Sequence, residues 1–221
     1  MDKKNKRLFF AFEVHSPWLK VTPEGRAINE EYRHLTIAFL GNVNWELFEP
    51  ALDAVPVPGL KVGLTGMFDQ LLFLPPGRAN VCALHAEWTN AVFDFDAYQQ
   101  TLAKWLEEQG ISIHLHKNGF LPHVTICRRP FSKKEWEDAF SPVPFYLSNF
   151  HLYESHPGLI YRPVWTFPIL PPFDQTHAFG ENEQQLAQNL EFARQYRDQF
   201  SSIPQIDVQS LPDDIIFNPH T

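Results

Sequence analysis

The sequence has little cysteine and no long apolar segment, and both absences exclude classes of protein. With no export signal beside them, its two cysteines, Cys82 and Cys127, predict free thiols in a reducing compartment. No apolar run approaches the roughly 18 residues of a membrane-spanning helix. The basic start, residues 1–7, precedes only five apolar residues, whereas a secretory signal needs about 7–15. We therefore expect a cytoplasmic protein without a membrane partner.

The formal net charge of −8 is concentrated at one end of the chain. Residues 1–170 carry 16 basic and 18 acidic side chains, whereas residues 171–221 carry 2 and 8. Together with the pair Pro171-Pro172, this shift predicts a domain over residues 1–170 and an acidic extension over residues 171–221. A narrow apolar stripe in the extension predicts one helix over residues 181–200. The domain itself is nearly neutral, so its charge does not exclude a nucleic-acid partner.

The composition indicates a folded protein rich in strands. Hydrophobic residues make up 44% of the chain and charged residues 20%, which excludes a disordered protein. The 20 phenylalanines favour strands, and the 19 prolines favour loops and edge strands over a helical bundle. Apolar patterns predict strands over residues 7–13, 34–40, 79–88, 111–115, 123–128, 145–154 and 159–167, with two more within residues 60–74. Residues 14–32 are expected to be loop with at most one weak helix.

Three segments carry signals for helices. One helix is predicted to begin at Asn44, and another to run from Asp94 or Asp96 to Gly110. A third begins at Ser132, whose capping box is completed by Glu135. The order of strands and helices predicts an α+β fold, with antiparallel-rich sheets flanked by helices.

Two four-residue segments, 89 residues apart, repeat one pattern: His34-Leu35-Thr36-Ile37 and His123-Val124-Thr125-Ile126. We call them the first and the second tetrad. Alternate residues of a strand share a face, so the histidine and threonine of each tetrad point one way and its two aliphatic side chains point into the core. A single such segment occurs often by chance, but two copies are harder to dismiss. Two strands related by an approximate two-fold axis would place both imidazoles and both hydroxyls across one groove.

These side chains suit acid–base chemistry at phosphorus. Histidine as a residue type titrates near 6.5, so of His34 and His123 one can be expected to accept a proton while the other donates one. The hydroxyls of Thr36 and Thr125, helped by Arg128, can hydrogen-bond the non-bridging oxygens of a phosphate. Such a set requires no metal and no cofactor. The reaction that fits is an in-line displacement at a phosphate on ribose, which opens a 2',3'-cyclic phosphate or transesterifies in the reverse sense.

The segments HLTIAFLG (residues 34–41) and PHVTICR (residues 122–128) resemble the signature of the 2H phosphoesterase superfamily. The resemblance is to the branch of 2'-5' RNA ligases and RNA 2',3'-cyclic phosphodiesterases, and with RLFFAF (residues 7–12) it spans about residues 6–170. It implies a bilobal, pseudo-two-fold fold with a central catalytic groove. It further implies that His123 is the base and His34 the acid, and that the two threonines hold the phosphate.

The implied activity is metal-independent hydrolysis of 2',3'-cyclic phosphate ends of RNA, to a 2'-phosphate, with weak 2'-5' RNA ligation in reverse. Two other functions remain open. One is a phosphodiesterase for 2'-5' oligonucleotides or for a small cyclic nucleotide. The other is a catalytically idle module that binds RNA ends. RNA or a small ribose phosphate is the expected partner in every case.

One position departs from the family pattern. RNA cyclic phosphodiesterases of this branch often have arginine two residues after the first tetrad's threonine, where this chain has Ala38. One phosphate or backbone contact is therefore expected to be missing. The arginine that this branch has two residues after the second tetrad's isoleucine is kept as Arg128.

Other residues carry weaker functional interpretations. His114 and His116 alternate along a predicted strand, but no further ligand at zinc spacing accompanies them, so no zinc site is expected. Cys127 is expected to be a buried thiol. The three remaining histidines of interest are expected to be structural or solvent-facing: His85, His151 and His156.

Basic and aromatic side chains near the tetrads are further candidates for contact with RNA. The basic clusters within residues 3–7 and 128–134 are expected to be solvated, although the second one flanks the groove and could steer RNA phosphates. Phe39, Phe120 and Tyr161 are candidates to stack on a base.

Overall fold

The computed structural model describes residues 4–18, 22–89, 93–115 and 119–172. Nearly all of the acidic extension, with the helix predicted over residues 181–200, lies outside the described residues. His116 lies outside them too. The division of the chain at residue 170 therefore stays a prediction.

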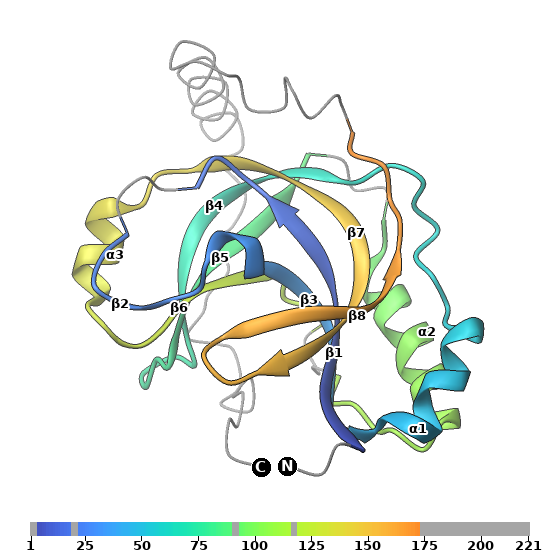
Figure 1. Ribbon diagram of the computed structural model, residues 1–221. Helices are drawn as coiled ribbons and strands as arrows, with labels where there is room; N and C mark the ends of the chain where they lie inside the picture. The colour runs from blue at the N-terminus through green and yellow to red at the C-terminus, as the bar shows by residue number, and fades with distance from the viewer. Residues whose placement is uncertain (1–3, 19–21, 90–92, 116–118, 173–221) are drawn as a thin grey trace.

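Eight strands form one antiparallel sheet (Figure 1). They are β1 (Asn5–His15), β2 (Gly25–Ala27), β3 (His34–Asn44), β4 (Thr65–Leu74), β5 (Val81–Trp88), β6 (His123–Phe131), β7 (Val143–His156) and β8 (Ile160–Phe167). The order is β1-β3-β6-β5-β4-β7-β8, and β1 also pairs with β7, so six strands close into a ring. Outside the ring, β2 pairs with β6 and β8 with β7. The sheet therefore resembles a small barrel.

Phenylalanine side chains fill much of the interior of this ring. Phe10 and Phe12 alternate along β1, and both are completely buried. The ring of Phe10 stacks on Phe150 of β7, with the centroids 5.4 Å apart, and Phe12 lies 4.9 Å from the same ring. Burial of such side chains contributes roughly 1.5–3 kcal/mol each, which explains why this residue type is frequent in the chain.

Short helices flank the sheet. They are α1 (Trp45–Phe48), α2 (Phe95–Glu108) and α3 (Lys133–Ala139), with 3-10 helices at Glu30–Tyr32 and Glu49–Ala54. Figure 1 shows α1 and α2 on one flank of the sheet and α3 on the opposite flank. Phe48 of α1 contacts Trp105 of α2, at 5.8 Å between ring centroids.

The predicted caps of the two longer helices are confirmed. The carboxylate of Asp94 accepts a hydrogen bond from the Ala97 backbone N–H at 2.9 Å, which selects Asp94 over Asp96 as the start of α2. The Ser132 hydroxyl accepts from the Glu135 backbone N–H at 3.4 Å. Asn44 makes no side-chain cap hydrogen bond, and α1 continues after one turn as a 3-10 helix.

The predicted antiparallel α+β class is confirmed, although the strands form a single sheet. Three local predictions are wrong. Residues 111–115 form no strand, because Ile111 and Ile113 pack against the core from an irregular segment. Residues 60–74 contain one strand, β4, where two were predicted. The residues before β4 form no hairpin with it, and the backbone N–H of Gly63 donates instead to the Leu170 carbonyl. The expected loop over residues 14–32 includes the short strand β2.

The two thiols are free, as predicted. Cys82 and Cys127 face each other in the register of β5 and β6, and both are completely buried. Within the described ranges, none of the helices has the length and apolar character needed to cross a membrane.

Candidate active site

The two tetrads lie side by side where β3 meets β6. Leu35 pairs with Val124 in antiparallel register. One step along each strand, the histidine of each tetrad therefore lies opposite the threonine of the other. Leu35 and Val124 are completely buried, whereas the histidines and threonines are half-buried on the other face of the sheet. The two histidines are diagonal neighbours, a relation that antiparallel geometry sets at about 7–8 Å between Cα atoms.

Each tetrad also contains a β-bulge at the same place. Between Thr36 and Ala38, β3 advances two residues while β1 advances one. Between Thr125 and Cys127, β6 advances two residues while β5 advances one. In both strands the extra residue is the isoleucine that ends the tetrad. The repeat in the sequence is thus also a repeat of backbone structure.

The bulges change which face the following residues occupy. Ala38 and Cys127 are buried in the core, and the residues that follow them, Phe39 and Arg128, line a pocket on the face with the histidines. Position 38 therefore points away from the groove. The contact expected to be missing at Ala38 is not a groove contact in this chain.

The two histidines are anchored in the same way. The Nδ1–H of His34 donates to the Tyr32 carbonyl at 2.7 Å, and the Nδ1–H of His123 donates to the Leu121 carbonyl at 2.9 Å. In both, the acceptor lies two residues earlier. Because a carbonyl oxygen can only accept, each neutral ring carries its proton on Nδ1, and Nε2 is the nitrogen that can take up a proton.

Aromatic side chains surround His34. Ring centroids of Phe9, Tyr161 and Tyr153 lie 4.6, 4.9 and 5.7 Å from the centroid of its imidazole. Tyr161 comes from β8 and Tyr153 from β7, so the closing hairpin predicted from the sequence forms one wall of the site. The aromatic wall excludes water from one side of the histidine.

This burial lowers the pKa of His34 to about 4. The hydrogen bond to the backbone opposes the shift, whereas the positive charges of Arg128 and His123 add to it. Three of the predicted site residues are therefore close enough to interact electrostatically. In the free protein, His34 is neutral at pH 7.

A pocket of about 410 Å³ opens beside His34. Of the predicted site residues, His34 and Arg128 line it, and Phe39 and Tyr161, two of the three stacking candidates, do so too. His123 and the two threonines are not part of the lining, but the register of β3 and β6 places them next to it.

Two other sequence predictions are corrected here. Phe120 stacks on Phe95 at 5.2 Å and packs against the core, so it is no candidate to stack on a base. His114 lies in the irregular segment after α2 instead of on a strand. Arg7 of the basic N-terminal cluster is exposed, as expected, and both Arg7 and His156 line the pocket. No local pattern in the sequence indicates that Arg7 lies beside residues more than 100 positions away.

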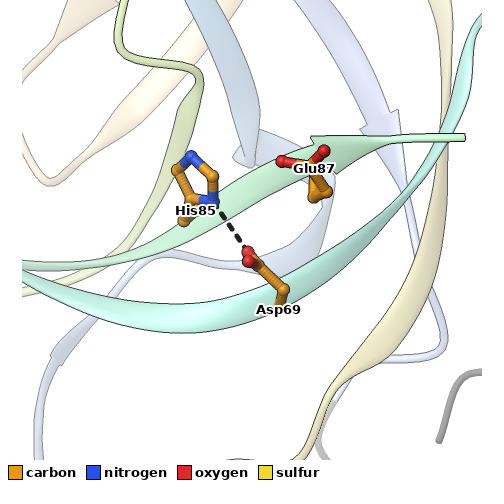
Figure 2. A group of neighbouring side chains, drawn as sticks. All are labelled: Asp69, His85 and Glu87. Atoms are coloured by element: carbon orange, nitrogen blue, oxygen red, sulfur yellow. Dashed lines mark hydrogen bonds and ion pairs between the residues drawn. The ribbon is translucent and has the colours of Figure 1, made fainter. Parts of the chain in front are cut away.

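A second cluster of titratable groups lies beside the second tetrad (Figure 2). His85 faces His123 in the register of β5 and β6. The His85 Nδ1–H donates to the Asp69 carboxylate at 2.7 Å. Ligand atoms of Asp69, His85 and Glu87 lie within 4.8 Å of one another, a spacing that a divalent cation could bridge. Burial raises the pKa of Glu87, and the charge of Asp69 raises it further. The metal-independent reaction stays a prediction.

A carboxylate network lies on β1 beside the first tetrad. The Glu13 carboxylate accepts hydrogen bonds from the Ser148 hydroxyl and the Asn149 amide, each at 2.9 Å. Nε2 atoms of His15 and His151 lie 3.7 Å from the same carboxylate oxygen. These partners, His15 first and then His151, hold the pKa of Glu13 far below its usual range. The sequence analysis did not identify this network.

The fold matches solved structures, although no family model and no curated protein matches the sequence. The first neighbour is Escherichia coli LigT complexed with 3'-AMP, at 22% identity and a TM-score of 0.53 over 75% of this chain and 98% of that one. LigT complexed with NADP+ matches at 23% identity and a TM-score of 0.53, over 76% of this chain and 99% of that one. The protein TT0787 of Thermus thermophilus matches at 20% identity and a TM-score of 0.51, over 76% of this chain and 100% of that one. This chain therefore has the fold of LigT, whereas the two pseudo-symmetric lobes implied by the resemblance stay a prediction.

Proposed function

We propose that this protein is a metal-independent phosphoesterase of the 2H superfamily that hydrolyses 2',3'-cyclic phosphate ends of RNA to 2'-phosphates. The observation that carries the proposal is the pairing of the two tetrads, with identically anchored histidines at the junction of β3 and β6. The nucleotide complexes of LigT support a ribose phosphate as the ligand. We retain two pseudo-symmetric lobes and a cytoplasmic location as part of this proposal.

The reaction proceeds by in-line attack of water on the cyclic phosphorus. His123 accepts a proton from the water through Nε2 as the new P–O bond forms. The bond from phosphorus to the ribose 3' oxygen breaks, and His34 donates a proton to that oxygen. Thr36, Thr125 and Arg128 hydrogen-bond the non-bridging oxygens, whose charge grows in the transition state. The products are a 2'-phosphate and a free 3' hydroxyl. Attack by a ribose hydroxyl in place of water gives the weak 2'-5' ligation.

The acid role of His34 depends on the substrate. Its pKa of about 4 leaves it neutral in the free protein at pH 7. A bound cyclic phosphate brings a negative charge next to the ring, and that charge favours the imidazolium form. Substrate binding and protonation of His34 are therefore coupled, so that the acid is charged only where a phosphate is bound.

The decisive experiment replaces each histidine in turn. His34→Ala and His123→Ala should each abolish hydrolysis of cyclic-phosphate-ended RNA in the presence of EDTA, while RNA affinity changes only a few-fold. His114→Ala, an exposed histidine outside the site, is the matched control and should retain full activity. Full activity in either tetrad variant, or a requirement for a divalent ion, would defeat the mechanism.

The same assay separates the alternative functions. A panel of cyclic-phosphate-ended RNAs, cyclic mononucleotides and 2'-5' dimers identifies the substrate, and product analysis identifies which ester bond breaks. An RNA-end-binding module without activity would bind the cyclic-phosphate RNA and turn over none of the panel.

A further inference from the structure

The pocket beside His34 has an unusual distribution of charge. Four arginines line it, namely Arg7, Arg26, Arg128 and Arg129, and none of its described lining residues is acidic. Its volume of about 410 Å³ lies within the range of small-ligand sites. A site with this lining favours an anion that carries more than one negative charge.

The arginines come from segments that the fold brings together. Arg7 lies on β1, Arg26 on the three-residue strand β2, and Arg128 and Arg129 on β6. β2 is fixed closely against β6 at Gly25, where a Cβ atom would lie 2.6 Å from the Cys127 sulfur and where φ is +152°. Only glycine fits there without displacement, so the position of Arg26 is set by packing.

Two of these arginines face each other directly. Arg26 pairs with Arg128 in the antiparallel register of β2 and β6. Like charges at directly opposite positions destabilise a strand pair. A bound anion between them offsets this repulsion, and guanidinium groups suit phosphate oxygens because of their planar set of donors.

The proposed reaction uses only one of the four. Arg128 interacts electrostatically with His34 and belongs with the reacting phosphate. A cyclic phosphate carries a single negative charge, which leaves Arg7, Arg26 and Arg129 without a role in the reaction. The pocket thus carries more positive charge than the reacting phosphate requires.

We propose that this pocket binds a second phosphate group of the substrate, held by Arg7, Arg26 and Arg129 next to the reacting nucleotide. The proposal rests on the proposed function and narrows its substrate class: ribose phosphates with at least two phosphate groups are preferred over simple cyclic nucleotides. The second group is either the preceding phosphodiester of an oligonucleotide or a phosphate on the 5' position of the same nucleotide. Phe39, 37% exposed at the edge of the pocket, is available to stack on a base.

The test compares substrates with one and two phosphate groups. The three substrates are adenosine 2',3'-cyclic phosphate, its 5'-phosphorylated form, and the dinucleotide that ends in the same cyclic phosphate. The readout is a preference ratio: kcat/KM for a two-phosphate substrate divided by kcat/KM for the simple cyclic nucleotide. Arg26→Gln and Arg129→Gln should each lower this ratio roughly tenfold, because each variant loses about one charge-assisted hydrogen bond to the second phosphate. Whichever two-phosphate substrate loses its advantage identifies the source of the second group.

Arg162→Gln is the matched control, because Arg162 is exposed on β8 and does not line the pocket. It should leave the ratio within two-fold. If all substrates are hydrolysed and Arg26→Gln and Arg129→Gln leave the ratio unchanged, the second-phosphate site is wrong and the proposed function stands.

If no substrate is hydrolysed, the proposed function is wrong, and direct binding decides the second-phosphate site. Adenosine 3',5'-bisphosphate should bind at least tenfold more tightly than 3'-AMP, and Arg26→Gln should remove that difference. In Arg26→Gln the affinity for the bisphosphate should also depend less on salt concentration, because one fewer pair of opposite charges is there to be screened. Equal affinities for the two ligands would overturn the site.

Discussion

Leu35 on β3 lies directly opposite Val124 on β6, and both side chains are completely buried. Because successive strand residues alternate between faces, this one pair determines that both histidines and both threonines share the opposite face. A register slip of one residue would turn the polar groups of one tetrad into the core. The apolar pair is thus a structural condition for the proposed chemistry.

Leu35→Ala tests this condition. Loss of a completely buried leucine should lower the free energy of unfolding by about 2–5 kcal/mol and should also lower activity, since it loosens the junction of the tetrads. Urea denaturation and hydrolysis rates measure the two effects. Leu47→Ala, at a leucine that is 78% exposed, is the control and should change the free energy of unfolding by less than about 0.5 kcal/mol. A stable and fully active Leu35→Ala protein would contradict the role of the pair.

The lowered pKa of His34 can be measured by NMR titration of the free protein. A value near 4 is expected, and Arg128→Gln should raise it, because the arginine's positive charge is one cause of the shift. Arg162→Gln should leave the pKa of His34 unchanged. The unfolded histidine binds protons near pH 6.5, so the protein should also lose stability as the pH falls from about 6.5 towards 4. An unshifted pKa in the wild type would contradict the buried environment.

Glu13→Gln should destabilise the protein at pH 7. The carboxylate accepts two hydrogen bonds and lies near two histidines, and its replacement should cost roughly 1–2 kcal/mol. A carboxyl with a depressed pKa contributes stability above its unfolded pKa, near 4.5, and loses that contribution as the pH falls. The difference between wild type and variant in urea should therefore shrink at low pH. A difference independent of pH would indicate a loss of packing alone.

Glu87→Gln should stabilise the protein at pH 7, the opposite of the effect expected for Glu13→Gln. Burial and the charge of Asp69 raise the pKa of Glu87, so its ionised form is penalised in the folded protein. Stability tied to this group is present at low pH and lost as the pH rises through its folded pKa. With EDTA present, the variant should be more stable than wild type at pH 7, by up to about 1 kcal/mol because the group is partly solvated, and equally stable at pH 3. Destabilisation at pH 7 would indicate that the carboxylate has a favourable partner.

The sequence predicts the parts of the site that depend on local pattern. The alternation of His34 with Thr36 and of His123 with Thr125 fixes a shared face within each strand. The capping box at Ser132 is read from a few residues, and the start of α2 is narrowed to Asp94 or Asp96 in the same way. The family resemblance supplies the expected fold. These predictions succeed because strand alternation and capping are properties of a few consecutive residues.

Contacts between distant segments explain what the sequence does not predict. Arg7 and Arg26 reach the pocket only because β1 and β2 lie beside β3 and β6, and no periodicity reports that. The bulge at Ile37 of β3 reverses the expected side for Ala38. The segment 111–115 alternates like a strand, yet it has no partner strand among the described residues. Alternation alone does not make a strand, because a strand also needs backbone hydrogen bonds to a neighbour.

The closed ring of strands has a consequence for the order of events during synthesis. β1 completes the ring only by pairing with β7, whose first residue, Val143, follows the last residue of β1, His15, by 128 positions. Pairing over such a separation forms slowly, so in a nascent chain β1 can pair with β3 on one edge while its other edge stays unpaired until β7 has left the ribosome. Truncated translation products that end before β7 would keep this edge open to other chains.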